Sequence, residues 1–340
     1  MIVSAYIAGI GGRFTGLRPG DYERLTHVNF AFARVKSGKA SVDHWFDTES
    51  ADAKVRELMQ NKGHLKVLLS IGGWGAGGFS PACETAEGRK ILSESFIKIV
   101  NDYGFDGVDL DWEYPAIGWS GIEAKPEDVQ NYTSWVEMLR EMLGPDMLIT
   151  MACGGARECV DNLELNKLVP IMDMFNLMTY DLCNHDRTSH HTSLFPSDLC
   201  KTKNAHDVVD LYIQAGVPKE KITIGSGFYA RVYRDVDGMD MPTTENSGPH
   251  PGWSSGYKQN SEFAEKTATG LQYDKKAEAA WAYNAETREL YTFDNERSVR
   301  AKRNYCINNG LAGVMFWEYN CDDDTSPLLK ALTGNLTKKD

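Results

Sequence analysis

The chain has 340 residues, of which 42% are hydrophobic and 25% are charged, a composition typical of globular proteins. Its 36 basic and 48 acidic residues give a net charge of −12, which argues against nucleic acid or an anionic membrane as the main partner. No apolar run approaches the roughly 20 residues that a membrane span requires. This balance favours a protein that acts on a neutral substrate, and we expect a monomer with no membrane partner.

The chain starts with an apolar run over residues 2–7, which predicts a buried strand rather than a secretory leader. A leader removed during processing would leave the same start, and we expect secretion rather than a cytoplasmic location. The seven cysteines are scattered, odd in number and without paired CxxC spacing, so neither a disulfide framework nor a zinc site is expected. At most one or two disulfide bridges would form.

Short apolar runs alternate with longer helical patterns along the chain. Hydrophobic residues at helical spacing predict helices over residues 86–104 and 126–144, each ending in a glycine. Eight strands that alternate with helices favour an α/β fold, a closed parallel (β/α)8 TIM barrel, over an open sheet. The apolar runs predict these strands over residues 2–7, 27–33, 66–71, 107–113, 147–153, 172–180, 222–229 and 313–317.

Residues 232–276, between the seventh strand and the eighth strand, break this alternation. They are rich in Gly, Pro, Ser and Tyr and show no long helical period. We expect a small inserted subdomain or a long ordered loop within a single catalytic domain of residues 1–340. Because the insertion follows the C-terminal end of a strand, it belongs to the barrel face that carries active sites.

Three carboxylates, Asp109, Asp111 and Glu113, alternate with apolar residues in the fourth predicted strand. In a strand this alternation places them on one face. Chains keep like charges together chiefly where chemistry needs a proton donor beside a fixed anion. Glu113, last on the strand, is best placed to meet a substrate, while Asp109 and Asp111 are expected to titrate as a coupled pair. A buried ion-pair or metal cluster is the alternative, but no Arg or Lys is nearby and no histidine is interleaved.

The segment Asp106-Gly-Val-Asp-Leu-Asp-Trp-Glu-Tyr-Pro115 resembles the DxxDxDxE signature of glycoside hydrolase family 18, the chitinase family. Four further motifs resemble those of the family and occur in its order along the chain. They are Ser70-Ile-Gly-Gly73, Met178-Thr-Tyr-Asp181, Tyr229-Ala-Arg231 and Trp317. The resemblance therefore covers nearly the whole chain.

The resemblance implies hydrolysis of β-1,4 bonds in chitin or N-acetylglucosamine oligosaccharides by substrate assistance, without metal or organic cofactor. Glu113 would protonate the glycosidic oxygen and later activate water. The acetamido oxygen of the sugar would attack C1, giving an oxazolinium ion with net retention. Asp111 would stabilise this cation, Asp109 would tune Asp111, and Tyr180 would hold the acetamido oxygen.

The resemblance also implies a set of substrate-binding residues. Ser70 and the glycines beside it are expected to support the site rather than perform chemistry. Trp317 offers a stacking surface for a sugar ring, with core packing as the alternative; exposed Trp74, Trp119 and Trp253 would be sugar platforms or loop packing. The substrate-binding residues are Tyr6, Phe32, Gly73, Trp74, Met178, Asp181, Tyr229, Arg231 and Trp317.

Two other functions use the same fold. An endo-β-N-acetylglucosaminidase would act on the chitobiose core of N-glycans, and a non-catalytic chitin-binding lectin would have lost the acid, which is present here as Glu113. A histidine cluster at residues 185–191 is expected to be a solvated loop rather than a metal site, because its spacing is irregular. The insertion is short for the family's inserted α+β subdomain, which predicts a shallow groove.

Overall fold

A closed barrel forms the centre of the fold in the computed structural model, which describes residues 1–9, 14–45 and 51–334, and only the backbone of residues 251–255. Within these ranges a nine-stranded sheet has the order β1-β14-β8-β7-β6-β5-β4-β2-β3, and β1 also pairs with β2, which closes it. The ninth strand, β3 (Lys39–Ser41), pairs antiparallel with β2. The barrel strands are β1 (Ile2–Ala8), β2 (His27–Lys36), β4 (Lys66–Gly72), β5 (Gly107–Asp111), β6 (Leu148–Cys153), β7 (Met174–Leu177), β8 (Ile222–Gly227) and β14 (Gly313–Trp317). The predicted (β/α)8 barrel is confirmed, and each predicted strand overlaps one of these.

The barrel strands form from near-continuous apolar runs because both of their faces are covered. In β4 every residue after Lys66 is buried, and all five residues of β5 are buried. The parallel register pairs Ser70 with Asp109 between β4 and β5, and Asp109 with Thr150 between β5 and β6. The register thus sets three polar side chains of neighbouring strands at one level.

Helices connect the strands, and both helices predicted from spacing are present. The helix α3 (Ala86–Tyr103) begins at the N-cap Thr85, whose side chain accepts a hydrogen bond from the Gly88 amide, and ends at Gly104 in the left-handed conformation. The other predicted helix is α4 (Asp128–Leu143). The remaining helices are α1 (Ala51–Asn61), α2 (Phe79–Cys83), α5 (Arg157–Asp161), α6 (Leu165–Leu168), α7 (Ala205–Gln214), α8 (Tyr257–Lys266), α9 (Glu296–Asn309) and α10 (Pro327–Thr333).

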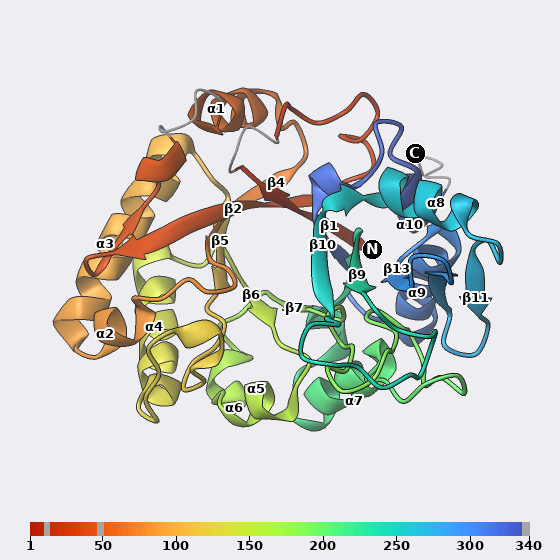
Figure 1. The fold of residues 1–340 in the computed structure, drawn as a ribbon. Helices are drawn as coiled ribbons and strands as arrows, with labels where there is room; N and C mark the ends of the chain where they lie inside the picture. Colours follow the sequence, from red (N-terminus) through yellow and green to blue (C-terminus); the bar gives the residue numbers. More distant parts are fainter. Residues whose placement is uncertain (10–13, 46–50, 335–340) are drawn as a thin grey trace. The chain divides into compact units, whose positions relative to one another are not determined.

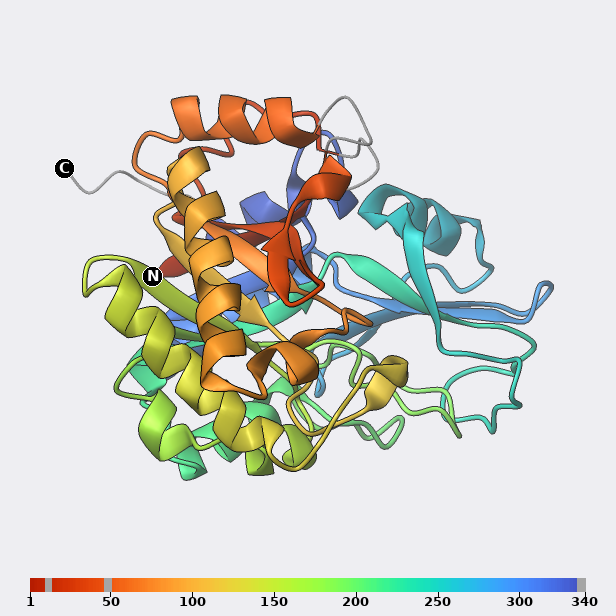
Figure 2. The ribbon, with the colours of Figure 1, turned by 90° about the vertical axis from the view of Figure 1, so that its left-hand side faces the viewer.

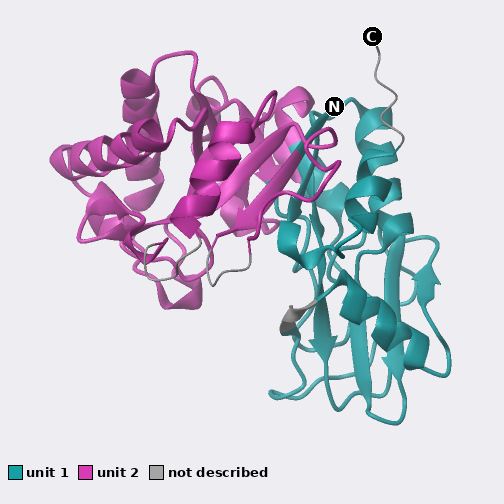
Figure 3. Cartoon of the chain, turned by 90° about the horizontal axis from the view of Figure 1, so that it is seen from above, with its two compact units in different colours: residues 1–3, 177–210, 223–340 teal, residues 4–176, 211–222 magenta. Residues whose placement is uncertain are grey.

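The chain divides into two compact units (Figure 3). The first contains residues 4–176 and 211–222, and its helices α1 and α3–α6 lie outside its strands (Figure 1). The second contains residues 1–3, 177–210 and 223–340. In the second unit the amide of Ile2 donates a hydrogen bond of 2.9 Å to the carbonyl of Ala312, so segments from opposite ends of the sequence belong to one unit.

A second sheet lies within the second unit. It is antiparallel, and α8 packs against β9, β10 and β12 of this sheet (Figure 2). The sheet and α8 together extend over residues 229–293, beyond the range 232–276 at both ends, so this part is larger than the short insertion expected. Its strands are β10 (His250–Gly256), β9 (Tyr229–Tyr233), β13 (Glu289–Phe293), β12 (Ala279–Asn284) and β11 (Gln272–Asp274), in spatial order.

No helix within the ranges that the structure describes has both the length and the apolar character needed to cross a membrane.

Candidate active site

The strand β5 and the residues after it hold the three predicted carboxylates in the first unit. The sequence predicted that Glu113 is the last residue of this strand. The strand instead ends at Asp111, and Glu113 lies two residues beyond it. Glu113 is nevertheless buried, as are Asp109 and Asp111. Trp112 packs against Phe79 of α2, with ring centroids 5.2 Å apart, which keeps the indole in the helical layer. We call Asp109, Asp111 and Glu113 the carboxylate cluster.

Asp109 is fully buried and is held by four side-chain donors. Its Oδ1 accepts hydrogen bonds from Thr150 at 2.5 Å, Tyr6 at 3.1 Å and Asn176 at 3.2 Å. Its Oδ2 accepts one from Ser70 at 2.7 Å. Burial raises the pKa of Asp109, and these hydrogen bonds oppose the rise. The predicted supporting role of Ser70 agrees with this contact.

Asp111 differs from Asp109 because its carboxylate is poorly satisfied. Its Oδ1 is buried and has no hydrogen-bond partner among the residues that the structure describes. Burial raises the pKa of Asp111 well above its ordinary value, and the charges of Glu113 and Asp109 raise it further. Arg34 lowers it. A buried acceptor without a donor is costly to the fold, and such groups are candidates for contact with a ligand.

The turn after β4 carries Gly73 and Trp74, two of the predicted substrate-binding residues. A Cβ on Gly73 would lie 2.6 Å from the ring of Phe32, so only glycine allows these two positions to approach so closely. Trp74 is 56% exposed, and Trp119 is 40% exposed with its ring 5.6 Å from that of Tyr114. Both indoles present apolar surface to solvent. The side chain of Trp253 lies outside what the structure describes.

The second unit holds another group of predicted residues. Arg231 Nε donates a hydrogen bond of 2.5 Å to Oδ1 of Asp181. Burial raises the pKa of Asp181, but hydrogen bonds with His191 and Arg231 outweigh it and hold the pKa well below its usual range. The ring of Tyr229 lies 6.2 Å from that of Tyr180 and 5.3 Å from that of His191, centroid to centroid. These residues form one polar and aromatic cluster.

Three predicted residues of the second unit lie at or just beyond strand ends. The strand β7 ends at Leu177, so Met178 and Tyr180 lie beyond it, and alternation along the strand does not decide the direction of their side chains. Trp317 is the last residue of β14 and is only partly buried. Its neighbour Phe316 stacks on Phe228 at a centroid distance of 4.2 Å, on the alternate face of the strand.

The sequence model of the glycosyl hydrolases family 18 matches residues 6–322. The chain belongs to this family. The membership predicted from the five motifs is therefore confirmed.

Two relatives of this family 18 chain are named as chitinases. Chitinase A1 of Niallia circulans is 29% identical over 89% of this chain and 53% of its own length, so the chain spans about half of that protein. Chitinase 1 of Aphanocladium album is 30% identical over 91% of this chain and 78% of its own length. A solved structure of a family 18 N-acetylglucosaminidase from Paenibacillus barengoltzii matches with a TM-score of 0.87 and 33% identity, covering 98% of each chain.

The family 18 chain places three residues at the carboxylate cluster that sequence reasoning did not select. Thr150 and Asn176 bind Asp109, and each is a polar residue within an apolar strand, a signal that the sequence does contain. Arg34 acts electrostatically on Asp111 and Glu113. The statement that no Arg or Lys lies near the cluster is therefore wrong, because β2 brings Arg34 from a distant part of the sequence.

Two histidines of the predicted solvated loop are fully buried. Nε2 of His190 lies 3.4 Å from Oδ2 of Asp274, and Nδ1 of His191 lies 3.6 Å from Oδ1 of Asp181. The expectation of a solvated loop is wrong for both, because each has a buried or partly buried carboxylate as a neighbour. His185, in contrast, is exposed.

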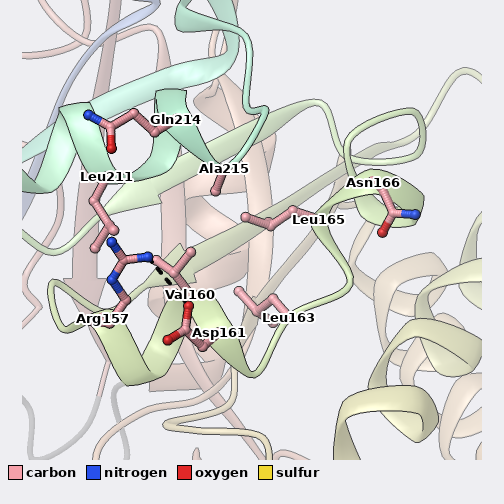
Figure 4. Close-up of a pocket in the computed structure, with 9 residues that line it drawn as sticks. All are labelled: Arg157, Val160, Asp161, Leu163, Leu165, Asn166, Leu211, Gln214 and Ala215. Atoms are coloured by element: carbon pink, nitrogen blue, oxygen red, sulfur yellow. Dashed lines mark ion pairs between the residues drawn. The ribbon is translucent and has the colours of Figure 1, made fainter.

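A surface pocket of about 470 Å³ lies elsewhere in the first unit (Figure 4). It is lined by side chains of α5, α6 and α7, including Val160, Leu165 and Leu211, and by the ion pair of Arg157 with Asp161. None of the predicted site residues lines it. Its shape and lining therefore say nothing about the carboxylate cluster.

Proposed function

We propose that this family 18 chain hydrolyses β-1,4 bonds between N-acetylglucosamine units of chitin or chito-oligosaccharides, with retention and by substrate assistance. The observation that carries the proposal is the carboxylate cluster: a buried Asp109 held by four side-chain donors lies beside an Asp111 whose Oδ1 accepts no hydrogen bond from the residues that the structure describes. An acetamido N–H of the substrate would supply that donor. The names of the two chitinase relatives support the substrate class.

The proposed reaction uses no nucleophile of the protein. Glu113 donates its proton to the glycosidic oxygen while the acetamido oxygen of the substrate attacks C1, and the bond to the leaving sugar breaks. Asp111 accepts the acetamido N–H and offsets the positive charge of the oxazolinium ion that forms. Glu113, now ionised, takes a proton from water, and the oxygen of that water opens the ring at C1. Both steps invert C1, so the configuration is retained.

The raised pKa of Asp111 fits this division of roles. When ionising a carboxylate is costly in the empty site, the ionised form is stabilised most strongly by a cation that forms beside it. Asp109, held by four donors, stays beneath it as a fixed acceptor. We therefore assign proton transfer to Glu113 and charge stabilisation to Asp111.

Release of single N-acetylglucosamine units is the second candidate, favoured by the match to a family 18 N-acetylglucosaminidase over nearly all of both chains. Mass spectrometry of a chitohexaose digest separates the two. A chitinase yields oligosaccharides of two or more units early in the reaction, whereas stepwise release yields the monomer and a pentamer. A high-mannose N-glycan serves as the comparison substrate, and faster turnover of that glycan than of chitotetraose would overturn the proposal.

A thiazoline analogue of the oxazolinium ion tests the mechanism separately. The analogue is expected to inhibit at far lower concentration than the product N-acetylglucosamine, because it resembles the intermediate. Failure to inhibit, in an enzyme that still cleaves chitohexaose, would exclude substrate assistance.

A further inference from the structure

Arg34 lies on β2, two residues after Phe32, and its guanidinium is partly buried in the first unit. Its Nη1 donates a hydrogen bond of 2.6 Å to the carbonyl of Gly72, and its Cζ lies 5.4 Å from the centroid of the Phe32 ring. A guanidinium has a planar fork of donors and remains charged in proteins. The Arg34 side chain therefore brings a permanent positive charge to the end of β4.

The residue that Arg34 binds is in direct contact with the carboxylate cluster. Gly72 pairs with Asp111 in the register of β4 and β5, and the amide of Gly73 donates a hydrogen bond of 2.8 Å to the carbonyl of Asp111. A Cβ on Gly72 would lie only 2.0 Å from that carbonyl oxygen, so the two backbones meet without room for a side chain. A shift of Gly72 would therefore move Asp111.

We propose that Arg34 is a positioning residue for the hydrolysis proposed above, on which this inference rests: its guanidinium holds the end of β4 against Asp111 and supplies the positive charge that faces the carboxylate cluster.

The charges around Asp111 support this role. Burial, Glu113 and Asp109 all raise the pKa of Asp111, and Arg34 opposes them. Three further titratable side chains act electrostatically with Asp111 in the part of the chain that the structure describes: Tyr114, after β5, Tyr132 on α4 and Cys153 on β6. Burial raises the pKa of each of these three well above its ordinary value, so all three are neutral at pH 7 and leave the positive charge of Arg34 uncancelled.

Variants separate the charge from the hydrogen bond. Arg34→Gln keeps a donor for the Gly72 carbonyl and removes the charge, whereas Arg34→Lys keeps the charge and loses the planar fork. We expect the acidic limb of the pH profile of kcat/KM to move to higher pH in Arg34→Gln, by about half a pH unit, which lowers kcat/KM about threefold on that limb. The KM should change less than kcat, and Arg34→Lys should keep the wild-type limb.

Arg157→Gln is the matched control, because it removes the same charge from the exposed surface of α5 in the same unit. Its profile should match that of the wild type. If Arg34→Gln does not fold, Arg34→Met keeps the aliphatic stem against Phe32 and carries the same expectation. If a folded variant without the charge keeps the wild-type midpoint of the acidic limb, the proposal is overturned, whatever the maximal kcat/KM of that variant.

A titration without turnover distinguishes failure here from failure of the proposed function. The carboxyl carbon of Asp111 is followed by carbon-13 NMR against pH, and its signal is assigned by its loss in Asp111→Asn. The midpoint should be higher in Arg34→Gln than in the wild type, and equal midpoints overturn the role of Arg34. Absence of wild-type hydrolysis of chitohexaose would instead reject the proposed function.

Discussion

The hydroxyl of Ser70 donates a hydrogen bond of 2.7 Å to Oδ2 of Asp109, and neither side chain is reached by solvent. The two residues are register partners on neighbouring strands, so the contact follows from the pairing of β4 with β5. A buried carboxylate is tolerated only when donors replace the water that it has lost. Ser70 is one of the four side chains that do so.

Ser70→Ala should therefore weaken the fold and raise the pKa of Asp109 further. The free energy of unfolding, measured by urea denaturation, should fall by about 1–3 kcal/mol because a buried acceptor loses its donor. Ser93→Ala is the control, since the Ser93 hydroxyl is equally buried but donates its hydrogen bond to the backbone carbonyl of Arg89 in its own helix rather than to a carboxylate. An equal loss in both variants would contradict the role given to Ser70.

Glu113→Gln should abolish hydrolysis while leaving oligosaccharide binding in place. The amide keeps the shape of the side chain but has no acidic proton, and general acid catalysis contributes about 10²–10⁴-fold to rate. The kcat on chitohexaose should fall by at least that factor, with binding followed by calorimetry. Glu137→Gln, on the exposed side of α4, controls for the loss of one carboxylate. Full activity of Glu113→Gln would refute the mechanism.

His27 makes the stability of the first unit depend on pH. Burial and the neighbouring charge of Lys66, its register partner, lower the pKa of His27 to about 4, and Asp106 opposes them. The unfolded chain, with a histidine pKa of about 6.5, binds more protons between these values. The contribution of neutral His27 to the free energy of unfolding is thus fully present above about pH 6.5 and is lost as the pH falls towards 4.

Replacing this histidine should flatten that dependence. In His27→Asn the decrease in the free energy of unfolding between pH 6.5 and 4 should be smaller than in the wild type by about 2 kcal/mol. Urea denaturation at several pH values measures it. His185→Asn, at an exposed position, should keep the wild-type slope, and an unchanged slope in His27→Asn would contradict the prediction.

A buried ion pair lies within the second unit. Nζ of Lys302 lies 2.6 Å from Oδ2 of Asp294, with both side chains fully buried, and it also bonds Thr192 at 2.5 Å. Lys302→Met should cost about 3–5 kcal/mol of unfolding free energy, because Asp294 is left as an unpaired buried charge.

The double variant Lys302→Met with Asp294→Asn should recover part of that loss, since the unpaired charge is gone. Lys98→Met removes the exposed pair with Asp102 on α3 and should cost at most about 1 kcal/mol. If Lys302→Met and Lys98→Met lose the same free energy of unfolding, the buried pair contributes no more than the exposed one, and the prediction is wrong.

The strands and the carboxylates could be predicted because their signals are local. Apolar runs mark β4 and β5, and the alternation around Asp109 places its side chain inside the barrel. Arg34 has no such signal: it reaches the cluster only because β2 pairs with β4. His190 and His191 stand in a polar stretch, and only the fold shows that Asp274 and Asp181 meet them. Contacts that depend on strand register or on loops distant in the sequence leave no pattern in any single short segment.

The hairpin of β12 and β13 lies beyond the predicted insertion, and its sequence gives little strand signal for a different reason. Ala279–Asn284 contains three alanines, which have low β propensity, and the strand is short. Its partner Glu289–Phe293 carries further aromatic residues and a β-branched threonine. Such strands are stabilised by pairing and packing rather than by the β propensity of their residues. The local sequence pattern therefore does not predict a strand there.

The hydrogen bond between Ile2 and Ala312 bears on how the protein is made. A ribosome must add more than three hundred residues after Ile2 before Ala312 exists, so β1 emerges long before this partner is available. During that time the residues of the first unit can emerge and pack, whereas the second unit waits for the late segments around β14. The unit that contains the carboxylate cluster can therefore begin to fold during translation before the unit that contains Asp181 and Arg231.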